Sequence, residues 1–246
     1  MNNASFFEKS RLSSRGCRHS DCVKTQLSEY STDTADATIQ HGLNHVYWMG
    51  GSPCSGKSSI SQLLAEWFDL SIYHVDEAFS AHVQRLDPVK HPALTKWHRL
   101  TWNERWMRPV DDLVQEAIAC YQEHFTLVLE DVLALPESKP VLVEGTALLP
   151  RQIAQLAPKP YQAIWVIPTA GFQQAQYSRR SWLRDILSEC EEPGAAFRNW
   201  MERDARFAGW VADEVSRLGL KALIVDGKQT LEENARQIAA HYEFKS

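Results

Sequence analysis

The octet Gly51-Ser52-Pro53-Cys54-Ser55-Gly56-Lys57-Ser58 decides the fold that we predict for this chain. It matches the pattern G-x-x-x-x-G-K-[ST] at every fixed position. The apolar run at 45–49 before it is typical of a buried strand. Residues 59–68 after it place apolar side chains along one face of a helix. The octet therefore lies in a strand–loop–helix context.

This context predicts a loop that binds the phosphates of a nucleoside triphosphate together with Mg²⁺. The free N–H groups and the positive dipole end of the helix would face the phosphates. Lys57 would contact the β- and γ-phosphates, Ser58 would be a ligand of Mg²⁺, and the helix N-terminus would favour the thiolate of Cys54. The residues assigned to nucleotide binding are Gly51, Ser52, Pro53, Cys54, Ser55, Gly56, Lys57, Ser58 and Ser59. The competing interpretation is a glycine-rich turn that binds nothing.

The composition fits one substantial globular domain. The chain has 246 residues, of which 44% are hydrophobic, and a net charge of −5, which argues against general nucleic-acid binding. No apolar stretch approaches the ~20 residues that span a membrane, and the N-terminus lacks an apolar signal region. Five cysteines without a regular framework indicate reduced thiols and a cytoplasmic location. The oligomeric state stays open.

The first part of the chain differs from the rest. Residues 1–43 are rich in Ser and Thr, contain few aliphatic residues and mix charges of both signs, which predicts a disordered N-terminal extension. A targeting peptide is the weaker alternative, because Glu8 and Asp21 interrupt any basic amphipathic face. The folded domain is then expected over 44–246.

Strand-like apolar runs alternate with helical segments from residue 45 onward. The five runs are residues 45–49, 71–75, 141–143, 163–167 and 222–225. Their near-continuous apolar character is typical of parallel strands that are covered on both faces. We therefore predict a doubly wound α/β fold with a five-stranded parallel sheet. Ligands bind beyond the carboxyl ends of such strands, where Asp76, Glu144 and Asp226 fall.

A helical insertion is predicted at about 78–138, between the second and third strands. It includes one long helix from Pro109 to Leu135. An insertion at the ligand-facing edge is a natural acceptor-binding subdomain, and several of its side chains suit an anionic or ring-bearing acceptor. These are Arg85, His91, Lys96, Trp97, His98, Trp102, Trp106 and Arg108. Packing is the simpler explanation for the tryptophans, since Trp102 and Trp106 are spaced i, i+4.

Four further segments carry a resemblance to a known family. They are His74-Val75-Asp76-Glu77, Val143-Glu144-Gly145, Tyr177–Arg184 and Val225-Asp226-Gly227. Together with the octet, they resemble small-molecule kinases of the nucleoside-monophosphate, shikimate and gluconate kinase superfamily, and in the Glu-Gly pair the uridine-kinase-like branch. The resemblance covers most of residues 45–243. It implies a P-loop NTPase fold with ATP and Mg²⁺ as cofactors.

The resemblance also implies a role for each polar residue in these segments. Asp76 is expected to face the acceptor hydroxyl, Glu144 to lie near Mg²⁺, and Asp226 to border the adenine pocket. Arg180 and Arg184 are expected on one face of a lid helix, where their guanidinium groups would contact phosphate. The catalytic candidates are therefore Lys57, Asp76, Arg180 and Arg184, and the candidate ligands of Mg²⁺ are Ser58 and Glu144.

Each of these assignments has a structural alternative. Asp76 also suits the N-cap of the helix that follows its strand, and the arginines suit a solvated helix surface. Arg203 and Arg206 form a second lid candidate, although Arg203 is equally suited to an ion pair with Asp204.

The sequence thus predicts an ATP- and Mg²⁺-dependent kinase that phosphorylates a small metabolite or nucleotide, whose identity stays open. The alternative is a regulatory ATPase, or a toxin-like kinase that acts on a cell-wall precursor or a macromolecular target. A buried acceptor pocket lined by charges would favour the first function. A broad exposed apolar patch beside the loop would favour the second.

Overall fold

The computed structural model describes residues 42–157 and 159–245. The predicted disordered extension lies outside the described residues, except for its last two positions. Leu43 at its end is fully buried in the core.

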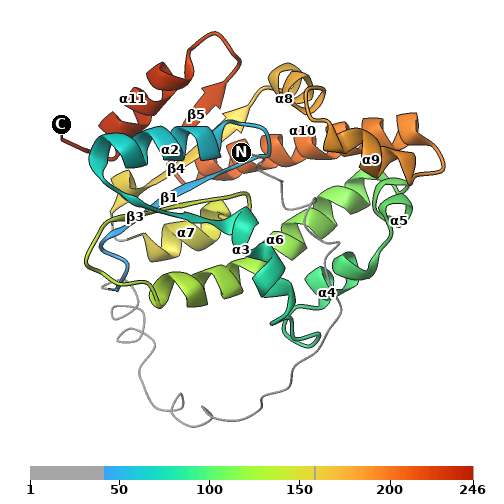
Figure 1. The fold of residues 1–246 in the computed structure, drawn as a ribbon, viewed down its shortest axis with the longest axis horizontal. Helices are drawn as coiled ribbons and strands as arrows, with labels where there is room; N and C mark the ends of the chain where they lie inside the picture. The colour runs from blue at the N-terminus through green and yellow to red at the C-terminus, as the bar shows by residue number, and fades with distance from the viewer. Residues whose placement is uncertain (1–41, 158, 246) are drawn as a thin grey trace.

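Five parallel strands form one sheet in the order β2-β3-β1-β4-β5 (Figure 1). They are β1 (Val46–Gly51), β2 (Ser71–His74), β3 (Val141–Glu144), β4 (Ala163–Pro168) and β5 (Lys221–Val225). The predicted parallel sheet and its five strands are confirmed, with strand ends within two residues of those expected. The central strand β1 pairs with β3 on one side and β4 on the other, and Met49 of β1 lies opposite Glu144 of β3.

Helices fill the segments between the strands. The described helices are α2 (Lys57–Phe68), α3 (Val75–Val83), α4 (Pro92–Arg99), α5 (Trp102–Trp106), α6 (Val110–Leu133), α7 (Pro150–Leu156), α8 (Ala170–Tyr177), α9 (Trp182–Ser188), α10 (Pro193–Arg217) and α11 (Leu231–His241), with a 3₁₀ turn at Pro160–Gln162. The long helix expected in the insertion is α6, and Pro109 is its N-cap residue. No helix in the described part of the chain is long and apolar enough to cross a bilayer.

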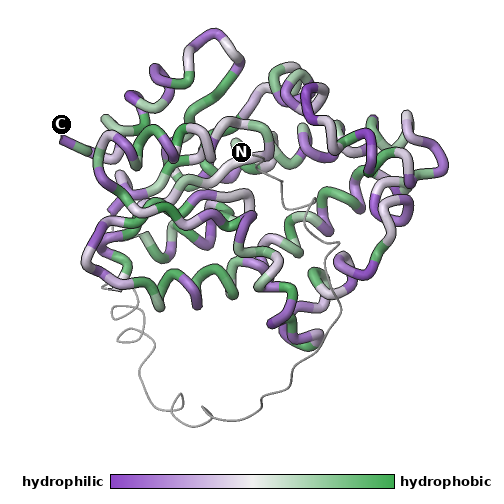
Figure 2. The backbone as a smooth tube through the Cα atoms, in the orientation of Figure 1, coloured by the Kyte–Doolittle hydropathy of each residue, from purple (hydrophilic) through white to green (hydrophobic). Residues whose placement is uncertain are grey.

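The helices lie on both faces of the sheet, which is compatible with the expected doubly wound fold. Helices α2 and α11 pack on one face, in a core that includes Met49 and Leu142. Helices α6, α7 and α10 pack on the other face, in a core that includes Trp48 and Val143. Adjacent strand residues serve opposite faces because side chains alternate across a strand. Green hydrophobic segments run along the strands and α6 in Figure 2.

The chain leaves the two neighbouring strands β1 and β3 in different directions. Helix α2 follows β1 on one face of the sheet, whereas α7 follows β3 on the other. The connections therefore diverge at the carboxyl ends of these strands, which is the position of the ligand crevice in open parallel sheets. The insertion helices α4 and α5 lie to the right in Figure 1, beside α6 and α10.

Candidate functional site

The 51–58 loop connects β1 to α2 through an unusual backbone path. Gly51 has φ +129° and lies so close to β4 that an added Cβ would stand 2.0 Å from the carbonyl oxygen of Val166. Cys54 and Gly56 also have positive φ, of 60° and 87°. Gly56 is the N-cap residue of α2 and, because it has no side chain, it makes no capping hydrogen bond. The first N–H groups of α2 are therefore oriented to receive an anion.

Two helices from the second half of the chain support this loop. Gln173 of α8 donates hydrogen bonds to Ser52 Oγ (3.0 Å) and to the carbonyl oxygen of Pro53 (2.8 Å). Ser52 Oγ donates to the carbonyl oxygen of Asp204 in α10 (3.5 Å). The Asp204 carboxylate in turn accepts from the Tyr177 hydroxyl (2.7 Å). These contacts fix the shape of the loop, and no sequence motif connects Gln173 or Asp204 with it.

The loop itself holds the side chain of Lys57. This residue is 7% exposed, and its Nζ donates to the carbonyl oxygen of Ser52 (2.9 Å) and to Ser55 Oγ (3.4 Å). Burial lowers the pKa of Lys57, while the charges of Glu144 and Asp76 act to raise it. Both acceptors of its hydrogen bonds are neutral oxygens. The positive charge of this buried ammonium group therefore suits an anion bound at the helix N-terminus.

Ser58 and Glu144 meet where β1 and β3 end side by side. Ser58 Oγ donates a hydrogen bond of 2.9 Å to Glu144 Oε1, and His74 Nδ1 lies 2.7 Å from the same oxygen. Glu144 is 4% exposed. Its hydrogen bond raises the pKa of His74 against the opposing effect of burial. We did not predict His74 as a site residue, because only the register of β2 against β3 places it opposite Glu144.

Asp76 lies in the first turn of α3, within electrostatic reach of Lys57 and Glu144. Burial, and secondarily the charge of Glu144, raise the pKa of Asp76 to about 6. Its Oδ1 is inaccessible to solvent and has no hydrogen-bond partner among the described residues. The N-cap residue of α3 is His74, whose side chain makes no capping hydrogen bond, so the N-cap alternative for Asp76 is wrong. A perturbed, unsatisfied carboxylate of this kind is typical of functional sites.

A glycine brings α3 close to the end of β3. An added Cβ at Gly145 would lie 2.4 Å from the Cβ of Val75, far inside contact distance. Only glycine therefore permits this approach, which holds the start of α3, and with it Asp76, beside Glu144.

The two predicted lid arginines lie on different elements. Arg184 is exposed on α9, whereas Arg180 lies in the non-helical segment between α8 and α9. The expectation that both share one face of a single helix is therefore wrong. Arg180 nevertheless lies near the loop, since its guanidinium hydrogen-bonds the Cys54 thiol and its charge affects the pKa of Asp76.

The favoured thiolate that the sequence predicts for Cys54 is not supported by the surroundings of this side chain. Burial raises the pKa of Cys54 to about 11, although the nearby charge of Arg180 opposes this. Loss of hydration therefore outweighs both the helix N-terminus and the guanidinium, and the prediction of a favoured thiolate is wrong.

The remaining candidates pair with acidic or basic residues outside the 51–58 loop. Asp226 is exposed at the end of β5, the edge strand, and pairs with Lys228 (2.8 Å). Arg203 is 2% exposed, with Nε 2.8 Å from Asp204 Oδ1, which confirms its ion-pair alternative. Arg206 is exposed and pairs with acidic residues at the surface.

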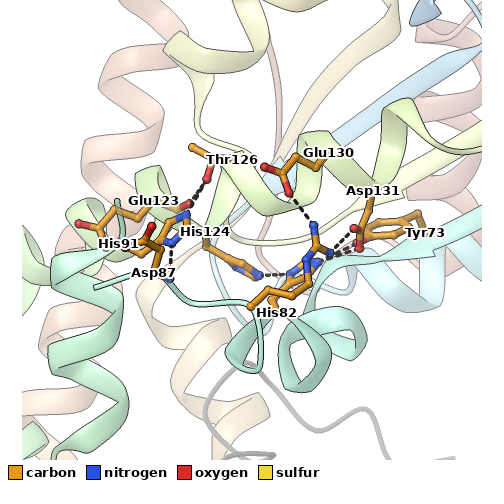
Figure 3. A network of polar contacts seen from close by, with 10 residues as sticks. Tyr73, His82, Asp87, His91, Glu123, His124, Thr126, Glu130 and Asp131 are labelled. Atoms are coloured by element: carbon orange, nitrogen blue, oxygen red, sulfur yellow. Dashed lines mark hydrogen bonds and ion pairs between the residues drawn. The ribbon is translucent and has the colours of Figure 1, made fainter. Parts of the chain in front are cut away.

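A network of polar side chains ties β2 and α3 to α6 (Figure 3). The ring nitrogens His82 Nδ1 and His124 Nε2 lie 2.8 Å apart, and His82 Nε2 lies 2.8 Å from Asp131 Oδ2. The same carboxylate accepts from the Tyr73 hydroxyl (2.8 Å) and from Arg85 (2.5 Å). The network therefore helps to fix β2 and α3, which carry His74 and Asp76.

Among the described residues, no group of three or more His, Cys, Asp or Glu side chains is arranged to hold a metal ion. The oxygen atoms of Ser58, Glu144 and Asp76 are of the type that Mg²⁺ prefers, and this ion commonly binds through one or two protein oxygens together with substrate phosphates. In comparisons with known proteins, no family model matches this chain and no curated protein matches it.

Proposed function

We propose that this chain is an ATP- and Mg²⁺-dependent phosphotransferase with a P-loop NTPase fold, and that its acceptor is a small molecule. The hydrogen bond between Ser58 and Glu144 carries this proposal. It unites the last hydroxyl of the 51–58 loop with a buried acid on the neighbouring strand, directly beside Lys57. A hydroxyl and a carboxylate at the N-terminus of a helix fit the Mg²⁺ site of a bound triphosphate.

Each side chain around the loop would then have its own role in phosphoryl transfer. Lys57 and the first N–H groups of α2 would bind and neutralise the phosphates. Asp76 would orient the acceptor hydroxyl and receive its proton, for which a pKa of about 6 is suitable. Arg180, which lies beside Cys54, would offset negative charge on the transferred group. Bound ATP with Mg²⁺ would supply the transferable phosphoryl group.

A small acceptor is favoured over a macromolecular target by the surface and the insertion. The exposed large hydrophobic residues in the described ranges are Trp67, Val89, Leu133, Ile224 and Leu231. None of them belongs to the 51–58 loop, so they provide no argument for a protein-docking patch there. Helices α4, α5 and α6 of the insertion instead line a small cavity with charged walls, together with Arg203 of α10.

The proposal is tested by a phosphorylation screen of metabolite pools with isotopically labelled ATP, read by mass spectrometry. We expect at least one small product that carries the labelled phosphoryl group in the presence of the wild-type protein. The folded Lys57→Ala variant should not form it. The macromolecular alternative would be favoured if neither protein transfers label to a small molecule and a protein or polymer fraction becomes labelled instead.

A further inference from the structure

A small cavity inside the insertion combines cationic and aromatic walls. Its volume is about 20 Å³, which is room for roughly one water molecule. The wall residues that matter for the argument are Trp97, Arg105, Arg108, Glu116, Tyr121 and Arg203. They come from α4, α5, α6 and α10 and from the segment between α5 and α6.

Arg105 is the most unusual residue of this cavity. It is 3% exposed, and its guanidinium lies 3.8 Å from the ring centroid of Trp97 and 4.3 Å from that of Trp102. Nη2 donates to the carbonyl oxygen of His98 (3.2 Å). Nε and Nη1 are inaccessible to solvent and have no hydrogen-bond partner among the described residues. Two buried donors of a cation are therefore unsatisfied.

This arrangement is unfavourable without an anion. Burial lowers the pKa of Arg105 to about 10, so the side chain is still a cation at neutral pH. The two flanking rings offset part of the lost hydration. A buried charge without a counter-ion is nevertheless strongly destabilising, and an acceptor atom would satisfy the two unpaired donors of this cavity-lining residue.

The acidic groups near the cavity already have cationic partners. Glu116 is the one carboxylate among the described wall residues, and it pairs with both Arg108 and Lys96. Arg203 forms an ion pair with Asp204. The charge of Arg105 is therefore not balanced by these carboxylates, and the cavity is positive overall.

Two wall residues of the cavity, Tyr121 and Arg203, are linked to residues of the proposed transfer site. Tyr121 lines the cavity, and the charge of Asp76 contributes to the raised pKa of this tyrosine. Arg203 lines it as well, and its neighbour Asp204 accepts a hydrogen bond from Ser52 of the loop.

We propose that this cavity binds an anionic oxygen group of the phosphoryl acceptor, a carboxylate or a phosphate, and that Arg105 is its principal ligand. That the anion belongs to a phosphoryl acceptor rests on the proposed function, whereas the binding of an anion at Arg105 is independent of it. Nε and Nη1 of Arg105 donate to the anion, while Trp97 and Trp102 hold the guanidinium plane in place. Because either anion is larger than a water molecule, its binding requires the walls of the cavity to separate.

The test measures binding of malonate and of inorganic phosphate by their concentration-dependent effect on thermal unfolding. Four proteins are compared: wild type, Arg105→Met, Lys57→Ala and the control Arg99→Met, which changes an exposed arginine of α4. Lys57→Ala removes the ammonium of the 51–58 loop, so that phosphate bound there is separated from phosphate bound in the cavity.

We expect at least one of the two anions to stabilise wild type, Arg99→Met and Lys57→Ala. Arg105→Met should bind that anion at least tenfold more weakly. Malonate alone would identify a carboxylate site, and phosphate retained in Lys57→Ala would identify a phosphate site. Equal stabilisation of wild type and Arg105→Met by both anions, or stabilisation by neither, would overturn the inference.

A second measurement covers the possibility that Arg105→Met does not fold. Hydrogen exchange of the wild-type protein is followed with and without the same anions. Binding should change exchange in peptides from residues 92–108 by at least severalfold, independently of nucleotide. Unchanged exchange in this segment at saturating malonate and phosphate would equally overturn the inference. Failure of ATP binding with a normal anion response would count against the proposed function and not against this site.

Discussion

The hydroxyl of Ser58 donates a hydrogen bond of 2.9 Å to Oε1 of Glu144, although the two residues lie 86 positions apart in the chain. The pairing of β1 with β3 creates this contact, because Met49 and Glu144 lie opposite each other in the register. The ring nitrogen Nδ1 of His74 also lies 2.7 Å from this carboxylate oxygen. Glu144 is thus held by two side chains that orient it toward the N-terminus of α2.

Glu144→Gln tests the proposed role of this carboxylate in Mg²⁺ binding. The amide keeps the shape of the side chain but removes its charge. We expect the Mg²⁺ concentration needed for half-maximal ATP binding to rise by about 10- to 100-fold, the range for removal of groups that support a metal site. Titration calorimetry at fixed ATP measures the effect. Glu137→Gln changes an exposed acid and should behave as wild type. Identical Mg²⁺ dependence in both variants would remove Glu144 from the metal site.

Asp76→Asn separates catalysis from stability. We expect turnover to fall by about a hundredfold or more, as for other positioned acid–base groups, with ATP binding largely retained. The folded pKa of about 6 lies above the ordinary value of 3.8, so the ionised carboxylate costs stability at pH values above 6. The variant should therefore be more stable at pH 7.5, on the order of 1–3 kcal/mol, by denaturant titration. Normal turnover with reduced stability would indicate a structural role.

Gly145→Ala tests the close approach of β3 to α3. The added Cβ would meet Val75 Cβ at 2.4 Å, and relief of the clash must move the segment that carries Asp76. We expect a loss of about 1–3 kcal/mol in the free energy of unfolding and reduced turnover. Gly209→Ala in α10 is the matched control, since its new Cβ meets nothing within 4 Å. It should be neutral or stabilise by about 0.5–1 kcal/mol. Equal stability of the two variants would contradict the contact.

The histidine network predicts sensitivity to mild acid. Burial, and then the charge of His82, lower the pKa of His124 to about 3 from its ordinary value of 6.5. Between these values the unfolded chain binds a proton that the folded protein does not, so stability falls as the pH falls from 6.5 toward 3. The slope reaches about 1.4 kcal/mol per pH unit. His124→Gln should flatten it in urea titrations between pH 6.5 and 4. Parallel pH profiles of variant and wild type would show that His124 titrates normally.

The five strands could be predicted from the sequence because each is a continuous apolar run between polar segments. Lys57 and Ser58 were predictable from one local pattern, and Asp76 and Glu144 from their positions after strands. His74 and Gln173 were not, because their roles depend on strand register and on helix packing. Neither property has a signature in a single sequence.

The break between α8 and α9 shows how tertiary packing overrides a local pattern. Tyr177 and Trp182 both pack on the ring of Trp200, with centroids 5.6 Å and 5.9 Å from it. In one continuous helix, positions five residues apart would point about 140° away from each other. The non-helical segment between them lets both rings reach Trp200 and leaves Arg180 near the loop.

Calorimetric titration of the purified protein with Mg²⁺-ATP tests the central claim most directly. The wild-type protein should bind one nucleotide per chain. A folded Lys57→Ala variant should bind at least tenfold more weakly, because the buried ammonium beside the helix N-terminus is lost. Lys90→Ala, which changes an exposed lysine, should match wild type. Absence of nucleotide binding by the wild-type protein, or equal affinity in the folded Lys57→Ala variant, would contradict the assignment of the 51–58 loop as a phosphate-binding loop.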